Sequence, residues 1–412
     1  MPRSGPFRRS TRTSFRALGN VVNAFRPARR SRVFQVPSFF SAWLTSEAAW
    51  PYLLITAVRS ALMVRRGEHR DPEGKVALGV NAVAMAGMAQ LVVEGRRTDE
   101  QFAAALSPWL DEEALLRRPT SVRLGAWLPF LYGGRGRRLR TRSVQFSDRG
   151  QTPALRLDVY EPTGPRPKGS LRPAIVQIHG GGWVIGDKRE QGIPLLNHLA
   201  HHGWVGFNVN YRLSPRVRAP EHLVDCKRAI AWIRAHADEY RIDPDFICVT
   251  GGSAGGHLAA MVALTAGDPQ YQPGFESADT SVQAAVPFYG LYDFADTSLL
   301  TPGFREMFAE RMLFGSTYAA DPTPFESYSP MHRIRPDAPP MMMVHGTRDI
   351  LIPIESARPF AAELARRSEH AVVWVELEGA QHAFDIFPSP RTVRTVEYVE
   401  RFLDGVRRGV IK

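Results

Sequence analysis

Short apolar runs that alternate with longer amphipathic segments dominate the chain after about residue 140. The segments 219–237 and 254–265 repeat their apolar residues at helical spacing, and apolar runs of strand length flank them. Strands that alternate with helices predict an α/β fold with a mostly parallel sheet and helices on both faces. The first two strands, joined by a glycine-containing turn, predict an antiparallel hairpin at one edge. The predicted strands are residues 143–146, 154–160, 174–179, 205–210, 246–250, 284–288, 341–344 and 372–377.

The chain before residue 140 differs in composition and in the spacing of its apolar residues. Residues 1–46 form an Arg-rich leader, and residues 47–140 are mostly apolar with helical spacing. The glycine and arginine cluster at 133–138 is typical of a linker, so the main boundary is placed near residue 140. This division predicts a mostly disordered leader, an apolar helical extension and a catalytic domain over residues 141–412.

Two apolar runs raise the question of a membrane. Residues 36–58 are interrupted by a glutamate and a proline, whereas residues 76–93 have only Asn81 and Gln90 as polar side chains. Both runs lie near the length that a helix needs to cross a bilayer. They are consistent either with membrane association or with helices packed in a bundle or on the catalytic domain.

The basic character of the chain is confined to its leader. The formal net charge is +11, but residues 1–46 hold nine Arg and no acidic residue. Because the remaining body is close to neutral, no nucleic-acid partner is expected for it. The leader, where Phe15, Leu18, Val21 and Phe25 recur at helical spacing, is open to three interpretations. It is a solvated arm, a segment that binds an anionic surface such as lipid or nucleic acid, or an organelle transit peptide. No apolar core of a secretory signal precedes a cleavage site, so a cytoplasmic or membrane-associated location is expected.

The first motif with a chemical meaning is Gly-Gly-Ser-Ala-Gly at 251–255. It follows a predicted strand directly and precedes a predicted helix. In such a strand–turn–helix the serine sits on a strained backbone, and Gly251 and Gly255 are needed because a side chain there would collide with its neighbours. Ser253 is therefore the candidate nucleophile.

A second motif, His-Gly-Gly-Gly-Trp at 179–183, follows another predicted strand. Consecutive glycines allow backbone N–H groups to turn into an open site, where Gly181, Gly182 and Ala254 would donate to the oxyanion of a tetrahedral intermediate. His179 and Gly180 are expected to support this loop. The alternatives are a flexible glycine-rich loop or a phosphate cradle, but the Gly-Lys-Ser/Thr pattern of a phosphate loop is missing.

Two further polar residues follow predicted strands. Asp349 and His382 each lie just past the carboxyl end of a strand. Because the carboxyl ends of parallel strands converge at one edge of a sheet, both are expected to meet Ser253. A serine hydroxyl needs an imidazole to accept its proton, and the imidazole needs a carboxylate to fix its tautomer. His382 is thus the candidate general base, and Asp349 is the candidate acid that orients it.

The remaining acids and histidines are weaker candidates. Asp385 and Glu378 are too near His382 in sequence for an easy contact with its Nδ1 atom. His257 and His345 are expected, like the histidine of the glycine loop, to support loop geometry.

The sequence gives no indication of a metal or another cofactor. A His-Glu-x-x-His motif, a cysteine pair and a clustered Asp/His set are all missing from the sequence. Cys226 and Cys248, in a helical and a strand pattern, are expected to be buried hydrophobic residues without a disulfide.

Taken together, these motifs resemble those of the hormone-sensitive-lipase-like branch of α/β-hydrolase esterases. The resemblance covers about residues 140–412 and implies hydrolysis of carboxylic esters without a cofactor. It implies the triad Ser253, Asp349 and His382, and it matches the three oxyanion donors named above. The motifs that carry it are HGGGW at 179–183, NYRLSP at 210–215, GGSAGG at 251–256, HGTRD at 345–349 and GAQHAF at 379–384.

Two positions depart from the pattern of that branch. The residue before the nucleophile is usually Asp and is Gly252 here, and the usual Asp-Tyr-Arg-Leu begins with Asn210 instead. Neither position touches the catalytic atoms. The long N-terminal region is similar to what some bacterial lipase and esterase relatives carry.

An insertion at about 290–340 is expected to form a helical cap over the site. Its apolar residues either shape the acyl pocket or pack in the core. The expected activity is hydrolysis of short to medium acyl esters, of small molecules or lipids. An amidase with the same triad and a non-catalytic, membrane-anchored scaffold remain as alternatives. The apolar residues of the insertion are Phe304, Met307, Phe308, Met312 and Phe314.

Overall fold

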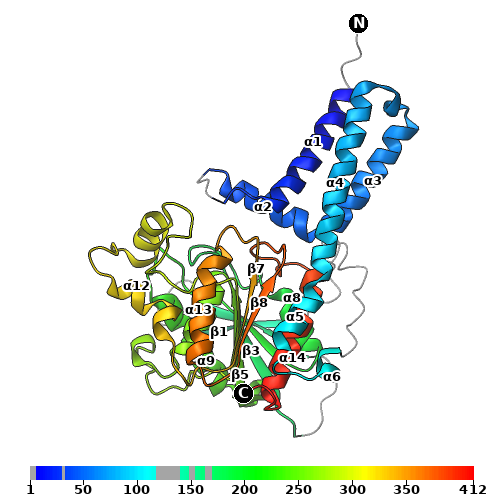
Figure 1. Ribbon diagram of the computed structural model, residues 1–412. Helices are drawn as coiled ribbons and strands as arrows, with labels where there is room; N and C mark the ends of the chain where they lie inside the picture. The colour runs from blue at the N-terminus through cyan, green and yellow to red at the C-terminus, as the bar shows by residue number, and fades with distance from the viewer. Residues whose placement is uncertain (1–5, 30–32, 117–139, 148–153, 163–168) are drawn as a thin grey trace.

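The computed structural model describes residues 6–29, 33–116, 140–147, 154–162 and 169–412 (Figure 1). The predicted linker at 133–138 lies outside these residues.

An eight-stranded sheet forms the centre of the catalytic domain. Its strands are β1 (Arg140–Ser147), β2 (Leu155–Tyr160), β3 (Arg172–Ile178), β4 (Val205–Val209), β5 (Ile242–Gly252), β6 (Ala284–Phe288), β7 (Met341–Gly346) and β8 (Val372–Leu377). The order across the sheet is β1-β2-β4-β3-β5-β6-β7-β8. β2 runs antiparallel to both β1 and β4, and the other neighbours are parallel. This arrangement confirms the predicted α/β-hydrolase fold with a hairpin at the sheet edge.

Helices cover both faces of the sheet. On one face lie α5 (Thr98–Leu106), α8 (Ile193–His201) and α14 (Pro390–Arg407), which share a hydrophobic core with one side of the strands. On the other face lie α9 (Glu221–Ala235), α11 (Ala254–Leu264) and α13 (Ile354–Arg367), which build a second core. The strands are buried on both sides, which explains their continuous apolar runs. Short helices α10 (Ala237–Tyr240) and η2 (Pro269–Tyr271) complete the connections.

The segment between β6 and β7 contains the expected helical insertion. It holds the π-helix η3 (Arg305–Phe314), α12 (Thr323–Ser327) and η4 (Pro330–Arg333). Phe314 is buried in the second core, whereas Phe304 and Phe308 are only partly buried against it and Met307 is exposed. The insertion therefore divides its apolar residues between core packing and its own surface.

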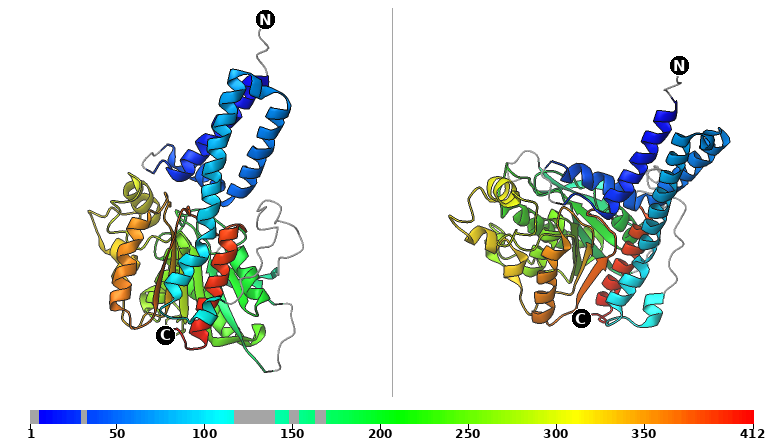
Figure 2. Two further views of the ribbon diagram at one scale, coloured as in Figure 1. Left: turned by 45° about the vertical axis from the view of Figure 1, so that its right-hand side comes forward. Right: turned by 45° about the horizontal axis from the view of Figure 1, so that its top comes forward.

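Most of the N-terminal region is helical. Its elements are α1 (Pro6–Phe25), α2 (Gln35–Glu47), α3 (Ala49–Arg65), η1 (Glu68–Arg70), α4 (Pro72–Arg96) and α6 (Glu112–Leu116), with α5 following α4 directly. The helices α1, α3 and α4 form a module that rises from the catalytic domain (Figures 1 and 2).

The leader thus departs from the prediction that residues 1–46 are mostly disordered. Val21 of α1 packs against α4, where Gly87 leaves room that a side chain would fill. Val21 is buried and Leu18 and Phe25 are partly buried beside it, whereas Phe15 stays 51% exposed, so part of the apolar stripe stabilises α1 by packing on α4.

Two ion pairs, one buried and one partly buried, tie the N-terminal helices to the catalytic domain. Glu47 at the end of α2 accepts hydrogen bonds from Arg391, at 3.1 Å, and from Ser389, at 2.8 Å. Arg348, just after β7, donates to both oxygens of Glu94 in α4 at 2.7 and 2.9 Å. Because a buried charge without its partner is costly, these pairs fix where α2 and α4 sit.

Candidate active site

The loop around Ser253 forms a sharp turn between β5 and α11. Ser253 has φ 59° and ψ −120°, a conformation that non-glycine residues rarely adopt. A Cβ atom on Gly251 would collide with the carbonyl of Gly255, and one on Gly255 would collide with the carbonyl of Ile178. The two glycines allow this turn, which places the serine at the carboxyl end of β5, as the sequence predicted.

Position 252, where the family pattern usually has Asp, is a glycine because Tyr289 occupies the space that a side chain would need. A Cβ atom on Gly252 would lie 2.6 Å from the Tyr289 hydroxyl oxygen and 2.9 Å from its Cε2. This hydroxyl donates a short hydrogen bond to Asp385, and the tyrosine ring lies 4.5 Å from the His382 ring. Tyr289 therefore borders both the nucleophile turn and the imidazole.

Asp349 and His382 are joined directly. The His382 Nδ1 atom lies 2.6 Å from Asp349 Oδ2. The other oxygen, Oδ1, accepts the backbone N–H groups of Leu351 and Ile352 at 2.9 and 2.8 Å, and His345 Nε2 lies 3.4 Å from Oδ2. Burial opposes ionisation of Asp349, but His382 and the hydrogen bonds outweigh it and lower the pKa of Asp349 to about 2. The carboxylate is thus charged and held in place to orient the imidazole.

The rival acids are engaged elsewhere. The Asp385 carboxylate accepts from Tyr289, and burial raises its pKa. Glu378 accepts from Arg97 at 3.0 Å on an exposed surface. Asp349 is the carboxylate in hydrogen-bond contact with His382.

The glycine loop after β3 lies against the nucleophile turn. A Cβ atom on Gly180 would lie 3.1 Å from the Ser253 Cβ, and Gly181 and Gly182 have φ values of 113° and 59°. The Gly180 N–H donates to Gln191 at 2.7 Å. Among the described residues, by contrast, the N–H groups of Gly181, Gly182 and Ala254 have no acceptor. Three unpaired donors beside a serine are what an oxyanion hole requires.

Two buried histidines support these loops. His179 Nδ1 lies 2.7 Å from the Gly180 carbonyl oxygen, and His257 Nε2 lies 2.7 Å from the Tyr328 carbonyl oxygen. Burial lowers the pKa of each imidazole to about 4. Both are therefore neutral at pH 7, and neither contacts Asp349.

Helix α2 covers the site, which the sequence did not reveal. The Phe39 ring centroid lies 6.2 Å from that of His382, and Trp43 Nε1 donates to the Ala383 carbonyl at 3.0 Å. Phe308 of the insertion approaches from another direction, since a Cβ atom on Gly182 would lie 2.6 Å from its Cζ. The aromatic i, i+4 pair in α2 was the available signal, but it does not say what the helix covers.

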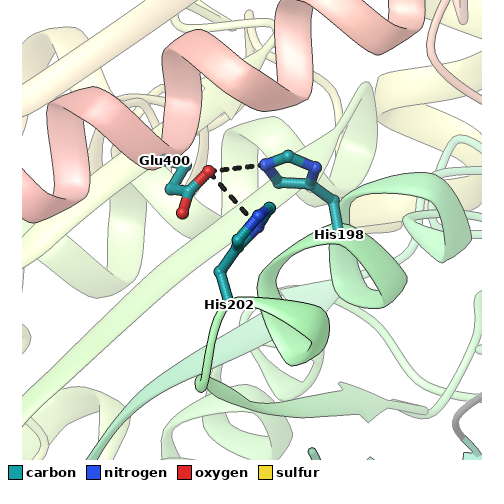
Figure 3. A group of neighbouring side chains, drawn as sticks. All are labelled: His198, His202 and Glu400. Carbon is teal, nitrogen blue, oxygen red and sulfur yellow. Dashed lines mark hydrogen bonds and ion pairs between the residues drawn. The ribbon is translucent and has the colours of Figure 1, made fainter. Parts of the chain in front are cut away.

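A separate group of side chains could hold a metal ion. Figure 3 shows His198 and His202, at the end of α8, facing the Glu400 carboxylate of α14. Oε2 of Glu400 lies 2.7 Å from His198 Nε2 and 3.4 Å from His202 Nδ1. A cavity of about 440 Å³ borders the group. Imidazole and carboxylate are ligands that Zn²⁺ accepts, and the fold brings together three such groups that the sequence did not show as a cluster. The i, i+4 spacing of the two histidines was the missed signal.

The chain is similar to known esterases in sequence and in fold. Residues 157–364 match the family described as BD-FAE. The probable carboxylic ester hydrolase LipM of Mycobacterium tuberculosis is 38% identical over 402 residues, which cover 94% of this chain and 90% of LipM. Esterase LipQ of the same organism is 42% identical over 282 residues, 66% of each chain. The solved structure of the esterase Est2 from Thermogutta terrifontis is similar with a TM-score of 0.53 and 29% identity, covering 63% of this chain and 89% of Est2.

Proposed function

We propose that Ser253, His382 and Asp349 carry the reaction of this chain. The chain belongs to the BD-FAE family and is a serine carboxylesterase of the hormone-sensitive-lipase-like α/β-hydrolases. The observation that carries this proposal is the 2.6 Å hydrogen bond between His382 and the buried Asp349, at the sheet edge where Ser253 also lies. A buried carboxylate that is ionised and bonded to Nδ1 leaves Nε2 as the basic nitrogen.

The first half of the reaction forms an acyl-enzyme. The Ser253 oxygen attacks the ester carbonyl while His382 Nε2 accepts the hydroxyl proton. The carbonyl oxygen becomes an oxyanion and accepts hydrogen bonds from the N–H groups of Gly181, Gly182 and Ala254. When the intermediate collapses, the bond to the alkoxy group breaks, and His382 returns its proton to the departing alcohol.

The second half releases the acid. Water loses a proton to His382 and attacks the acyl carbonyl, and the same three donors bind the second oxyanion. Cleavage of the bond to the Ser253 oxygen then gives the carboxylic acid, and His382 returns the proton to the serine oxygen, which restores the free serine and the neutral imidazole. The imidazolium that forms in each half is stabilised by Asp349, which remains ionised because of its low pKa.

Short to medium acyl esters are the proposed substrates. Est2, the esterase to which this chain is similar, has been solved with butyrate and with propionate bound. In this chain Phe308 lies against Gly182 and Phe39 lies beside His382. We infer that these two aromatic side chains limit the length of the acyl chain.

The test is hydrolysis of p-nitrophenyl esters from acetate to palmitate by the full-length chain. The whole N-terminal region is kept because α2 packs on the loop of His382. Ser253→Ala should lower kcat by about 10⁶-fold, as loss of the nucleophile does in such triads. Ser298→Ala, at an exposed serine of the insertion, is the matched control and should keep wild-type activity.

A phosphonate that reacts with activated serines provides a second readout. The wild-type chain should gain the mass of one adduct on the peptide that contains Ser253, and Ser253→Ala should gain none. If Ser253→Ala keeps wild-type kcat, the triad assignment is wrong.

A further inference from the structure

The outer side of α3 is mostly apolar from Trp50 to Val64, with Arg59 and Ser60 half-exposed. Between Trp50 and Val64 the exposed residues are all apolar, although this side faces away from the rest of the chain. Ile55 and Val58 are 53% and 52% exposed. The exposed residues are Trp50, Leu54, Ile55, Ala57, Val58, Ala61, Leu62 and Val64.

Helix α4 shows the same property beside it. Its buried residues recur every three or four positions and pack against α1 and α3. The opposite side contains a single polar side chain, Gln90, between Val76 and Val93. The exposed residues are Val76, Gly79, Ala82, Val83, Ala86, Ala89, Gln90 and Val93. We call the two exposed sides together the α3–α4 apolar face.

Water is a poor solvent for this face. A helix at the surface of a soluble protein has one apolar side, which faces the core, and a polar side, which faces water. Here the core side is already occupied, and the remaining side is apolar as well. Residues 76–93 are about 27 Å long at 1.5 Å per residue, close to the ~30 Å of a bilayer's hydrocarbon layer. By length and composition, the helix Pro72–Leu106 is the one described helix that could cross a membrane.

Helix α1 begins and helix α3 ends at the far end of the module (Figure 1), and both segments contain arginines. Arg9 and Arg12 in α1, and Arg65, Arg66 and Arg70 near the turn into α4, are exposed, and these five outnumber the three acids of that turn, Glu68, Asp71 and Glu73. Within the described part of the chain none of the five forms an ion pair with a carboxylate. Unpaired arginines next to an apolar face are complementary to a layer of anionic headgroups above acyl chains.

We propose that the α3–α4 apolar face docks on an anionic phospholipid bilayer, with the acyl chains against the apolar side chains and the phosphates against the arginines. Because α2 connects this module to the loops after β7 and β8, docking holds the candidate active site on the membrane-facing side of the enzyme.

The test is flotation of the full-length chain with vesicles of phosphatidylcholine and phosphatidylglycerol in a 3:1 ratio, after removal of detergent. The wild type should float, and vesicles of phosphatidylcholine alone should recover less protein. The variant Ile55→Asp/Val58→Asp/Val83→Asp should remain in the soluble fraction, with at least about a tenfold loss of floated protein, since a charged residue costs ~2–4 kcal/mol in hydrocarbon.

Controls separate docking from folding and from catalysis. Val410→Asp places the same charge on a valine that is 54% exposed outside the module, and it should float like the wild type. Ser253→Ala should also float, so that a failure of the proposed triad leaves this proposal intact. Circular dichroism should show that the triple variant keeps its helices.

Two results would overturn the proposal. The first is a triple variant that floats as well as the wild type. The second is a wild-type chain that ignores vesicles and forms a stable dimer in analytical ultracentrifugation, which the triple variant loses. That second result would mean that another copy of the chain covers the face.

Discussion

A methyl group added at Gly252 tests the reason given for the missing aspartate. In Gly252→Ala the new Cβ would lie 2.6 Å from the hydroxyl oxygen of Tyr289, 2.9 Å from its Cε2 and 3.0 Å from its Cζ. These atoms belong to a buried ring and cannot withdraw into solvent. Overpacking of this kind costs about 1–3 kcal/mol, so the free energy of unfolding should fall by that amount.

A double-mutant cycle shows whether Tyr289 is the cause. Tyr289→Leu removes the three atoms that collide, and it has its own cost because a large buried side chain becomes smaller. In the Tyr289→Leu background, the added methyl group should cost less than in the wild type, with a coupling of at least about 0.5 kcal/mol. Urea unfolding of the four proteins gives both numbers.

The same methyl group at Gly95 is the matched control. Gly95 lies in α4, and within the described residues no atom beyond its chain neighbours and its own helix backbone lies within 4 Å of where its Cβ would be. Gly95→Ala should therefore leave stability unchanged or raise it by up to ~1 kcal/mol through helix propensity. If Gly252→Ala behaves like Gly95→Ala, or if its cost is the same in both Tyr289 backgrounds, the steric explanation is refuted.

Three other predictions concern catalysis, the attachment of α2 and pH. Asp349→Asn should lower kcat by about 10⁴-fold with unchanged circular dichroism, because the amide favours the wrong imidazole tautomer; a loss below tenfold would contradict its role. Glu47→Ala should lower the free energy of unfolding in urea by about 3–5 kcal/mol, because it leaves the buried Arg391 without its carboxylate. Glu363→Ala, which removes the carboxylate of an exposed ion pair, is the control and should leave this free energy unchanged. Burial lowers the pKa of His179 and His257 to about 4 in the folded chain, whereas an exposed histidine has a pKa of 6.5. As the pH falls, these histidines are therefore protonated in the unfolded chain before they are protonated in the folded chain. Stability should therefore fall as pH drops from 6.5 to 4, by up to about 3 kcal/mol per histidine, and His257→Gln should flatten the profile.

The candidate triad could be predicted because each of its members depends on local sequence. Ser253, Asp349 and His382 each follow an apolar run of strand length, and parallel strands bring such positions to one edge. The need for Gly251 and Gly255 could also be predicted from local sequence. A side chain at either position would collide with the backbone around the strand–turn–helix, an arrangement that the sequence itself predicts. The sheet and its hairpin needed only the alternation of strands and helices.

Contacts between distant segments could not be predicted in this way. Phe39 lies beside His382, and Glu47 pairs with Arg391, across more than 300 residues of chain. No spacing rule relates such positions, because the docking of α2 depends on the shape of a surface that exists only after the sheet has formed. The leader was expected to be disordered because its arginines are evident in the sequence. The packing of its apolar residues against α4 is a long-range contact, which the sequence does not show.

The apolar run at 76–93 shows where sequence periodicity stops being informative. A helix that is apolar on all sides gives the same pattern in a protein core and in a bilayer, so the sequence left both interpretations open. The structure separates the two sides. Ala84 and Met88 are buried against neighbouring helices, whereas Val83 is 60% exposed on the opposite side. Packing within the chain buries only one side of α4. The opposite side is apolar and exposed, and the arginines at the end of the module fit the anionic membrane proposed as its partner.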